Sequence, residues 1–116
     1  MSPYRSEPQV RNPACTDPLG GYIAPHTDGV RMDAGTCAPT RISFLLYLST
    51  VPEGEGGETT FLDRLPEACG EGQSPRAIWS CQPTAGSILI FPHHAPHQGE
   101  ACGVAWSKVL LRGDLF

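Results

Sequence analysis

The chain is poor in charged residues, has no cluster of basic residues and contains no long apolar run. Only 17% of its 116 residues are charged, and eight basic residues stand against twelve acidic ones, for a net charge of -4. Without a Lys/Arg cluster to neutralise a row of phosphates, we expect no nucleic-acid partner. No apolar run approaches the roughly 18 residues of a membrane helix, and the N-terminus leads into polar sequence. We therefore expect no membrane segment and no signal peptide; the localisation stays unassigned, with the cytoplasm as the default.

The cysteines also lack a pattern. Their number is odd, they are widely spaced, and none forms a C-x-x-C pair. A zinc cage needs clustered cysteines, and a complete set of disulfides needs an even number. We therefore expect mostly free thiols at the five positions, which are Cys15, Cys37, Cys69, Cys81 and Cys102.

Glycine and proline, in contrast, are abundant. The 13 glycines and 12 prolines make up more than a fifth of the chain and fall between short apolar runs. This punctuation is typical of many short strands joined by turns. The length fits one domain with a single core. We expect that domain over residues 21–116, after an irregular lead-in over residues 1–20 that supplies little or no helical support.

Apolar and β-branched runs between the turns predict about seven strands and no convincing helix. The longest run covers residues 41–50, and it can pair with residues 58–62 across a Gly-rich turn. Residues 63–76 resemble a loop with room for a single helical turn. The predicted fold class is therefore mainly all-β, a double-sheet jelly roll or barrel. The other expected strands cover residues 22–26, 77–81, 87–91 and 106–112.

A histidine and a carboxylate two residues apart carry the strongest chemical signal. His26 and Asp28 lie at the end of a predicted strand, where alternate residues share a face and can converge on one ion. His97 follows a second core strand and completes a set of two imidazoles and one carboxylate. Such a facial triad leaves three positions of an octahedral metal open, as in non-haem Fe(II) oxygenases. His93 and His94, in the same segment as His97, stay open as alternative ligands.

A buried cation near such a site would anchor the distal carboxylate of a dicarboxylate cosubstrate. Lys108 lies eleven residues after His97, in the last predicted strand. By the period of two, Lys108, Leu110 and Arg112 share one face of that strand. We expect Lys108 to be the anchor and Arg112 to be the fallback if the register differs.

Five segments repeat the pattern of a known family in the same order. They are Tyr22-x-x-x-His26-x-Asp28-Gly29; Leu46-Tyr47-Leu48; Gly56-Gly57-Glu58-Thr59-Thr60-Phe61; Gly86-Ser87-Ile88-Leu89-Ile90-Phe91-Pro92; and His97-Gln98-Gly99 continuing to Lys108 through Phe116. Together they closely resemble the prolyl 4-hydroxylase-like 2-oxoglutarate oxygenases over nearly all of residues 21–116. The interval between His97 and Lys108 is slightly longer than is usual in that family, and a one-residue bulge would absorb the difference.

The resemblance implies a double-stranded β-helix (jelly-roll) core that binds Fe(II) through His26, Asp28 and His97. It also implies 2-oxoglutarate as the cosubstrate, chelating the iron, with O2 as the oxidant and ascorbate as a further cofactor. No catalytic residue is expected beyond the metal site.

The resemblance assigns three residues to the cosubstrate. Lys108 would pair with the far carboxylate of 2-oxoglutarate, Tyr47 would add a hydrogen bond to the same carboxylate, and Tyr22 would belong to the same pocket. The implied reaction hydroxylates a peptide or protein side chain, with prolyl residues as the first guess.

Two other interpretations remain open. One is a truncated, non-catalytic jelly-roll module that binds metal and acts through protein contacts, with self-association of an uncovered sheet face. The other is a cupin-like jelly roll. Cupins gather their ligands through a His-x-His pair, whereas this chain has His26-x-Asp28.

Overall fold

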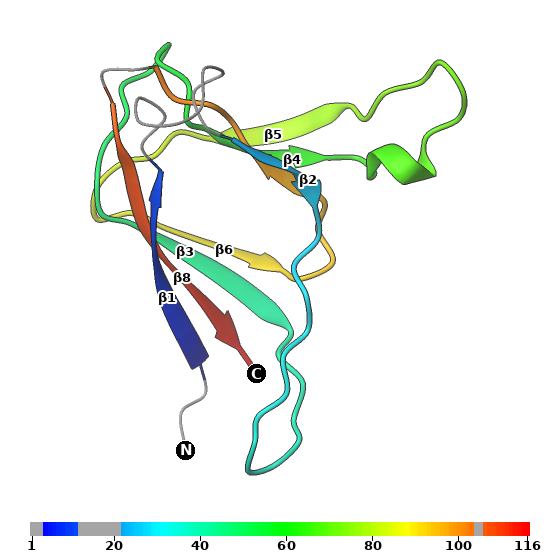
Figure 1. The fold of residues 1–116 in the computed structure, drawn as a ribbon, viewed down its shortest axis with the longest axis vertical. Helices are drawn as coiled ribbons and strands as arrows, with labels where there is room; N and C mark the ends of the chain where they lie inside the picture. Colours follow the sequence, from blue (N-terminus) through cyan, green and yellow to red (C-terminus); the bar gives the residue numbers. More distant parts are fainter. Residues whose placement is uncertain (1–3, 12–21, 104–105) are drawn as a thin grey trace.

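The computed structural model describes residues 4–11, 22–103 and 106–116, and this part of the chain consists of strands and one short 3-10 turn (Figure 1). The described residues contain no α-helix, which confirms the predicted mainly-β class. The elements are β1 (Tyr4–Arg11), β2 (Ile23–His26), β3 (Ile42–Tyr47), β4 (Thr59–Leu62), η1 (Pro66–Ala68), β5 (Ala77–Cys81), β6 (Ile88–Pro92), β7 (His97–Gly99) and β8 (Lys108–Leu115).

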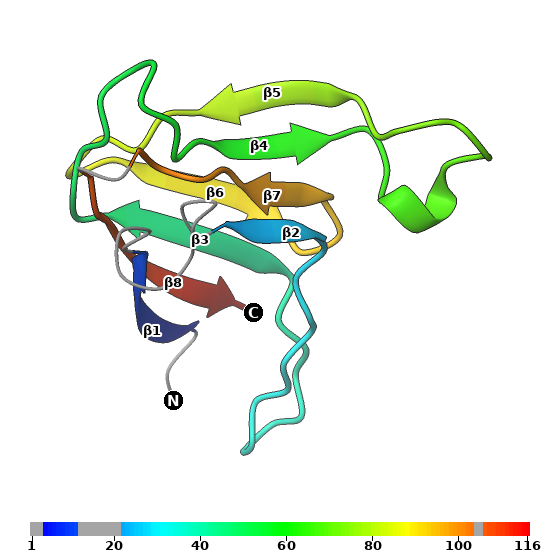
Figure 2. The same cartoon turned by 45° about the horizontal axis from the view of Figure 1, so that its top comes forward.

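The strands form two four-stranded antiparallel sheets that face each other (Figures 1 and 2). The order is β1-β8-β3-β6 in one sheet and β2-β7-β4-β5 in the other. Apart from β4 and β5, neighbouring strands are not consecutive in the chain, because the chain crosses repeatedly from one sheet to the other. This is the double-sheet jelly roll that the short, Gly/Pro-punctuated strands predict.

The core lies between the sheets and follows the period of two along each strand. On β3, alternate residues including Leu45 and Tyr47 are buried, and Tyr47 is fully inaccessible to solvent. Phe61 of β4 reaches in from the opposite sheet and meets Phe91 of β6 edge-on, with ring centroids 5.1 Å apart. Apolar burial and aromatic contact across the gap therefore join the two sheets.

The structure differs from the expected lead-in over residues 4–11, whereas residues 1–3 and 12–20 lie outside its described part. Within the expected irregular lead-in, Tyr4–Arg11 forms β1, which pairs antiparallel with β8 along its whole length, from Tyr4 opposite Leu115 to Arg11 opposite Lys108. The segment has no apolar alternation, so its own sequence gives no strand signal. It becomes a strand because it adds to the edge of β8, and an edge position tolerates Pro8.

The expected pairing of residues 41–50 with residues 58–62 is also wrong. β3 lies between β8 and β6, whereas β4 lies between β7 and β5 in the other sheet. The connection between them is held by backbone contact, since Gly57 N–H donates to the Ala101 carbonyl at 2.9 Å. Gly56 has φ +80°, and a Cβ there would lie 2.0 Å from the Ala101 oxygen, so only glycine allows this crossing.

Three further expectations can be compared with the described part of the chain. The loop over residues 63–76 contains a single 3-10 turn, η1. Four cysteines are free thiols, while Cys15 lies outside the described residues. No helix among the described residues is long and apolar enough to cross a membrane.

Phe61 provides the test of this core. Phe61→Ala removes a ring that is 8% exposed and contacts the opposite sheet, so we expect the free energy of unfolding to fall by about 3–5 kcal/mol. Urea denaturation followed by circular dichroism measures the change. Ile78→Ala is the control, because Ile78 is 65% exposed on β5 and its loss should cost less than about 0.5 kcal/mol. Equal losses for both variants would contradict the core assignment.

Candidate metal centre

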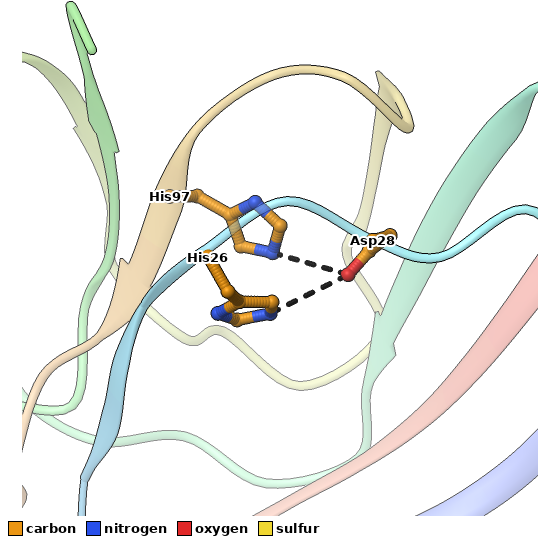
Figure 3. Close-up of side chains that lie close together, drawn as sticks. All are labelled: His26, Asp28 and His97. Atoms are coloured by element: carbon orange, nitrogen blue, oxygen red, sulfur yellow. Dashed lines mark ion pairs between the residues drawn. The ribbon is translucent and has the colours of Figure 1, made fainter. Parts of the chain in front are cut away.

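The pairing of two short strands creates the site. His26 is the last residue of β2, His97 is the first residue of β7, and the register places the two directly opposite each other. Their ring centroids are 4.3 Å apart. Asp28 follows two residues after His26, where the chain leaves the sheet, and it turns its carboxylate toward both rings (Figure 3).

The three side chains aim their ligand atoms at one point. The Asp28 Oδ1 lies 3.4 Å from the His26 Nε2 and 3.6 Å from the His97 Nε2 (Figure 3). All three ligand atoms lie within 4.8 Å of one another. Neighbouring ligand atoms around a metal with bonds of about 2.1 Å are about 3 Å apart, so a small contraction would close the triad around an ion.

Both imidazoles are held in the tautomer that a metal needs. The Nδ1–H of His26 donates to the Ala24 carbonyl at 2.8 Å, and the Nδ1–H of His97 donates to the Ala95 carbonyl at 2.9 Å. In the neutral form of each ring, the Nε2 lone pair therefore faces Asp28. Such hydrogen bonds to the non-ligating nitrogen are typical of metal-bound histidines.

The charge states also suit a cation. Burial by itself would raise the pKa of Asp28, but hydrogen bonds from His26 and Ser43 and the charges of His97 and Arg112 lower this pKa to about 2. Burial lowers the pKa of His97, which keeps its ring neutral near pH 7. The hydrogen bond to Asp28 raises the pKa of His26, so protonation of that ring competes with metal binding.

A cavity of about 240 Å³ opens beside the triad. It is smaller than the roughly 300–1,000 Å³ of sites for drug-sized ligands, which suits a compact cosubstrate. Lys108 and Arg112 both line it from β8, as the period of two predicts, and Lys108 is 5% exposed. The lining residues are Ile23, His26, Thr27, Asp28, Gly29, Leu45, Thr59, His97, Gln98, Gly99, Lys108, Leu110 and Arg112.

The two tyrosines assigned to the cosubstrate lie elsewhere. Tyr22 is 55% exposed and is not among the residues that line the cavity. Tyr47 is buried behind the wall, and its hydroxyl hydrogen-bonds the Thr59 hydroxyl at 2.7 Å. Thr59 itself lines the cavity, so Tyr47 reaches it through Thr59. The Lys108 Nζ lies 5.9 Å from the centroid of the Tyr47 ring.

The alternative ligands His93 and His94 lie outside the triad, and the fallback cation Arg112 lies beside it. His93 is 4% exposed, and both its ring nitrogens are engaged, by Ser43 at 2.7 Å and by Thr40 at 2.7 Å. His94 is exposed and is not part of the triad. Arg112 lines the cavity next to the triad, and its Nη2 lies 3.7 Å from the Asp28 Oδ1.

The comparison with protein families agrees with this donor set. The family model described as the 2OG-Fe(II) oxygenase superfamily matches residues 12–112. The chain belongs to the 2OG-Fe(II) oxygenase superfamily. Membership implies an Fe(II) site and 2-oxoglutarate, and the residues present fit the ion by their geometry, tautomers and charge. No curated protein matches this oxygenase chain.

A solved structure supports the fold. This superfamily member is similar to a prolyl-4-hydroxylase of Pseudomonas putida, with a TM-score of 0.59 and 17% sequence identity. The match covers 97% of this chain and 51% of the Pseudomonas chain. At this identity the likeness establishes the double-stranded β-helix fold. The chain spans about half the length of that protein.

Metal binding tests the triad directly. Asp28→Ala and His97→Ala each remove one ligand atom of the site. Loss of a residue that only hydrogen-bonds to a metal ligand typically lowers metal affinity about 10–100-fold, so we expect these two variants to lose more than about a hundredfold in Co(II) affinity. Competition titration against a chromophoric chelator measures it. His94→Ala is the matched control and should bind like the unaltered chain. A comparable loss in the control would make His94 a ligand.

Proposed function

We propose that this oxygenase is a 2-oxoglutarate- and Fe(II)-dependent dioxygenase that hydroxylates a side chain of a peptide or protein, with prolyl residues as the first candidates. One observation carries the proposal: the His26–Asp28–His97 group and the Lys108 ammonium line a single small cavity. A metal site at one end and a buried cation at the other are what a chelating dicarboxylate requires.

Each residue then has a defined task. His26, Asp28 and His97 would hold Fe(II), and the bound ion would supply the oxidative decarboxylation of 2-oxoglutarate by O2 to succinate and CO2, coupled to hydroxylation of the substrate. Apolar side chains of the cavity wall, Leu45 and Leu110, limit the access of water to the site. The protein thus contributes binding, orientation and a dry environment.

The position of Lys108 favours it over Arg112 as the anchor for the distal carboxylate. The two residues are four apart, or about 13 Å along an extended strand. Arg112 stands beside Asp28 at the metal end, and its Nη2 is also 3.1 Å from the Asp114 Oδ1. Lys108 stands at the far end, where the distal carboxylate of a metal-chelating cosubstrate would lie.

A second, more open cavity supports a peptide substrate. It shares Thr27 and Asp28 with the metal cavity and has a largely apolar wall that includes Val30, Ile42 and Pro92. A peptide segment lying there would bring a side chain close to the triad. The name of the similar Pseudomonas protein, a prolyl-4-hydroxylase, favours a prolyl residue as that side chain.

A non-catalytic metal-binding module is the second candidate. It is favoured by apolar side chains on the edge strand β6, where Ile88 is 56% exposed and Ile90 is 57% exposed. Such a surface suits protein contacts or self-association. Turnover separates the two functions.

Succinate release is the decisive measurement for the enzyme. The purified chain with Fe(II), ascorbate, 2-oxoglutarate and a pool of proline-containing peptides should form succinate, and one peptide should gain the mass of an oxygen atom. Asp28→Ala should abolish both signals because it removes a ligand of the metal. Metal binding without succinate from any peptide would instead support the non-catalytic module.

Lys108→Met tests the cosubstrate anchor, because it removes the charge and keeps most of the side-chain length. A charge-assisted contact is worth about 1.5–3 kcal/mol, so the 2-oxoglutarate concentration for half-maximal succinate release should rise about 10–100-fold. Co(II) affinity should stay unchanged, and Lys108→Arg should recover part of the loss. An equal loss of metal and cosubstrate binding would argue against the anchor role.

A further inference from the structure

Three buried polar side chains form a hydrogen-bonded row that ends on the metal ligand Asp28. Thr40 is 1% exposed, Ser43 is fully inaccessible and His93 is 4% exposed. Thr40 hydrogen-bonds the His93 Nε2 at 2.7 Å, and the His93 Nδ1 hydrogen-bonds the Ser43 hydroxyl at 2.7 Å. The Ser43 hydroxyl in turn donates to the Asp28 Oδ2. Buried polar groups are costly unless paired, so each hydrogen in this row needs a defined place.

Counting donors and acceptors fixes the direction of the row. The Asp28 carboxylate only accepts, so the single hydrogen of the Ser43 hydroxyl is used on Oδ2. Ser43 must then accept the hydrogen of the His93 Nδ1. On its other side, the His93 Nε2 lies 2.7 Å from the Thr40 hydroxyl and 3.9 Å from the Asp114 Oδ1. The Thr40 oxygen accepts the Arg31 backbone N–H at 2.8 Å, so every member of the row has a partner.

His93 also holds Asp28 through the backbone. The Asp28 N–H donates to the His93 carbonyl at 3.0 Å, so one residue fixes both the main chain and, through Ser43, the carboxylate of the ligand. The two carboxylate oxygens thereby differ. Oδ2 is engaged by Ser43, whereas Oδ1 faces the His26 and His97 Nε2 atoms.

Arg112 makes this restraint necessary. Its Nη2 lies 3.7 Å from the Asp28 Oδ1 and competes with a metal for that oxygen. An Asp28 carboxylate free to rotate could turn both oxygens to the guanidinium, a favourable bidentate arrangement. The bond from Ser43 opposes that rotation.

We propose that Thr40, His93 and Ser43 form a positioning relay that presents Asp28 to the metal through Oδ1 alone and keeps the remaining coordination positions open for cosubstrate. His93 is a positioning residue in this relay and not a ligand. The inference rests on the proposed function, since it concerns the same metal centre.

Co(II) affinity of the full chain, with a check of the thermal unfolding midpoint, tests the relay. Ser43→Ala should weaken Co(II) binding about 10–100-fold, the range for a partner of a metal ligand. His93→Leu should weaken it about tenfold. His93→Asn places an amide N–H near the position of the Nδ1–H, so its affinity should stay close to that of the unaltered chain. His94→Leu is the neighbouring control and should have no effect.

The double variant Ser43→Ala/His93→Leu separates a relay from general packing. If His93 acts through Ser43, the second substitution adds almost no loss once Ser43 is gone. Losses that multiply, or equal losses for His93→Leu and His93→Asn, would overturn the relay. If the unaltered chain fails to bind Co(II), the metal centre and the proposed function fall as well. If it binds Co(II) with the expected pattern but forms no succinate, the relay stands and only the enzyme function fails.

Discussion

The antiparallel pairing of β2 with β7 sets His26 opposite His97, and the rest of the site depends on this register. A shift by one residue would turn one imidazole to the other face of the sheet, and no chelating pair would remain. The core holds the register, because the His97 ring packs against two core rings. Its centroid lies 4.8 Å from that of Phe91 and 5.7 Å from that of Phe61. The rings that join the two sheets therefore also fix one member of the candidate metal triad.

A network of buried charge connects this site to the C-terminal strand. Arg112 lies between two carboxylates, 3.7 Å from the Asp28 Oδ1 and 3.1 Å from the Asp114 Oδ1. Asp114 also meets the Arg31 Nε at 3.2 Å, from the segment between β2 and β3. Removing one partner of such a network leaves an uncompensated buried charge. The network thus ties β8 to the segment that carries Asp28 and Arg31.

Two cationic side chains of β8, Lys108 and Arg112, line the cavity four residues apart on the strand. Arg112 lies beside the candidate metal triad, where its positive charge balances the negative charge of Asp28. Lys108 is 5% exposed and lines the same cavity, and under the proposed function its ammonium would pair with the second negative group of the cosubstrate.

Sequence alone determined the residue types and the local periods. The spacing of His26 and Asp28, the place of Lys108 and Arg112 on one strand face, and the short strands between Gly/Pro turns are local properties that survive without knowledge of the fold. The His97-Gln98-Gly99 pattern predicted His97 as the third member of the triad but left His93 and His94 open as alternatives. The tertiary structure separates them, because His97 starts β7 opposite His26, whereas His93 is enclosed by Thr40 and Ser43. The strand Tyr4–Arg11 and the separation of β3 from β4 into opposite sheets were likewise decided only by the tertiary structure. The pairing of distant strands depends on backbone hydrogen bonds and burial across the whole fold. The sequence of a single segment therefore does not predict which strand it will pair with.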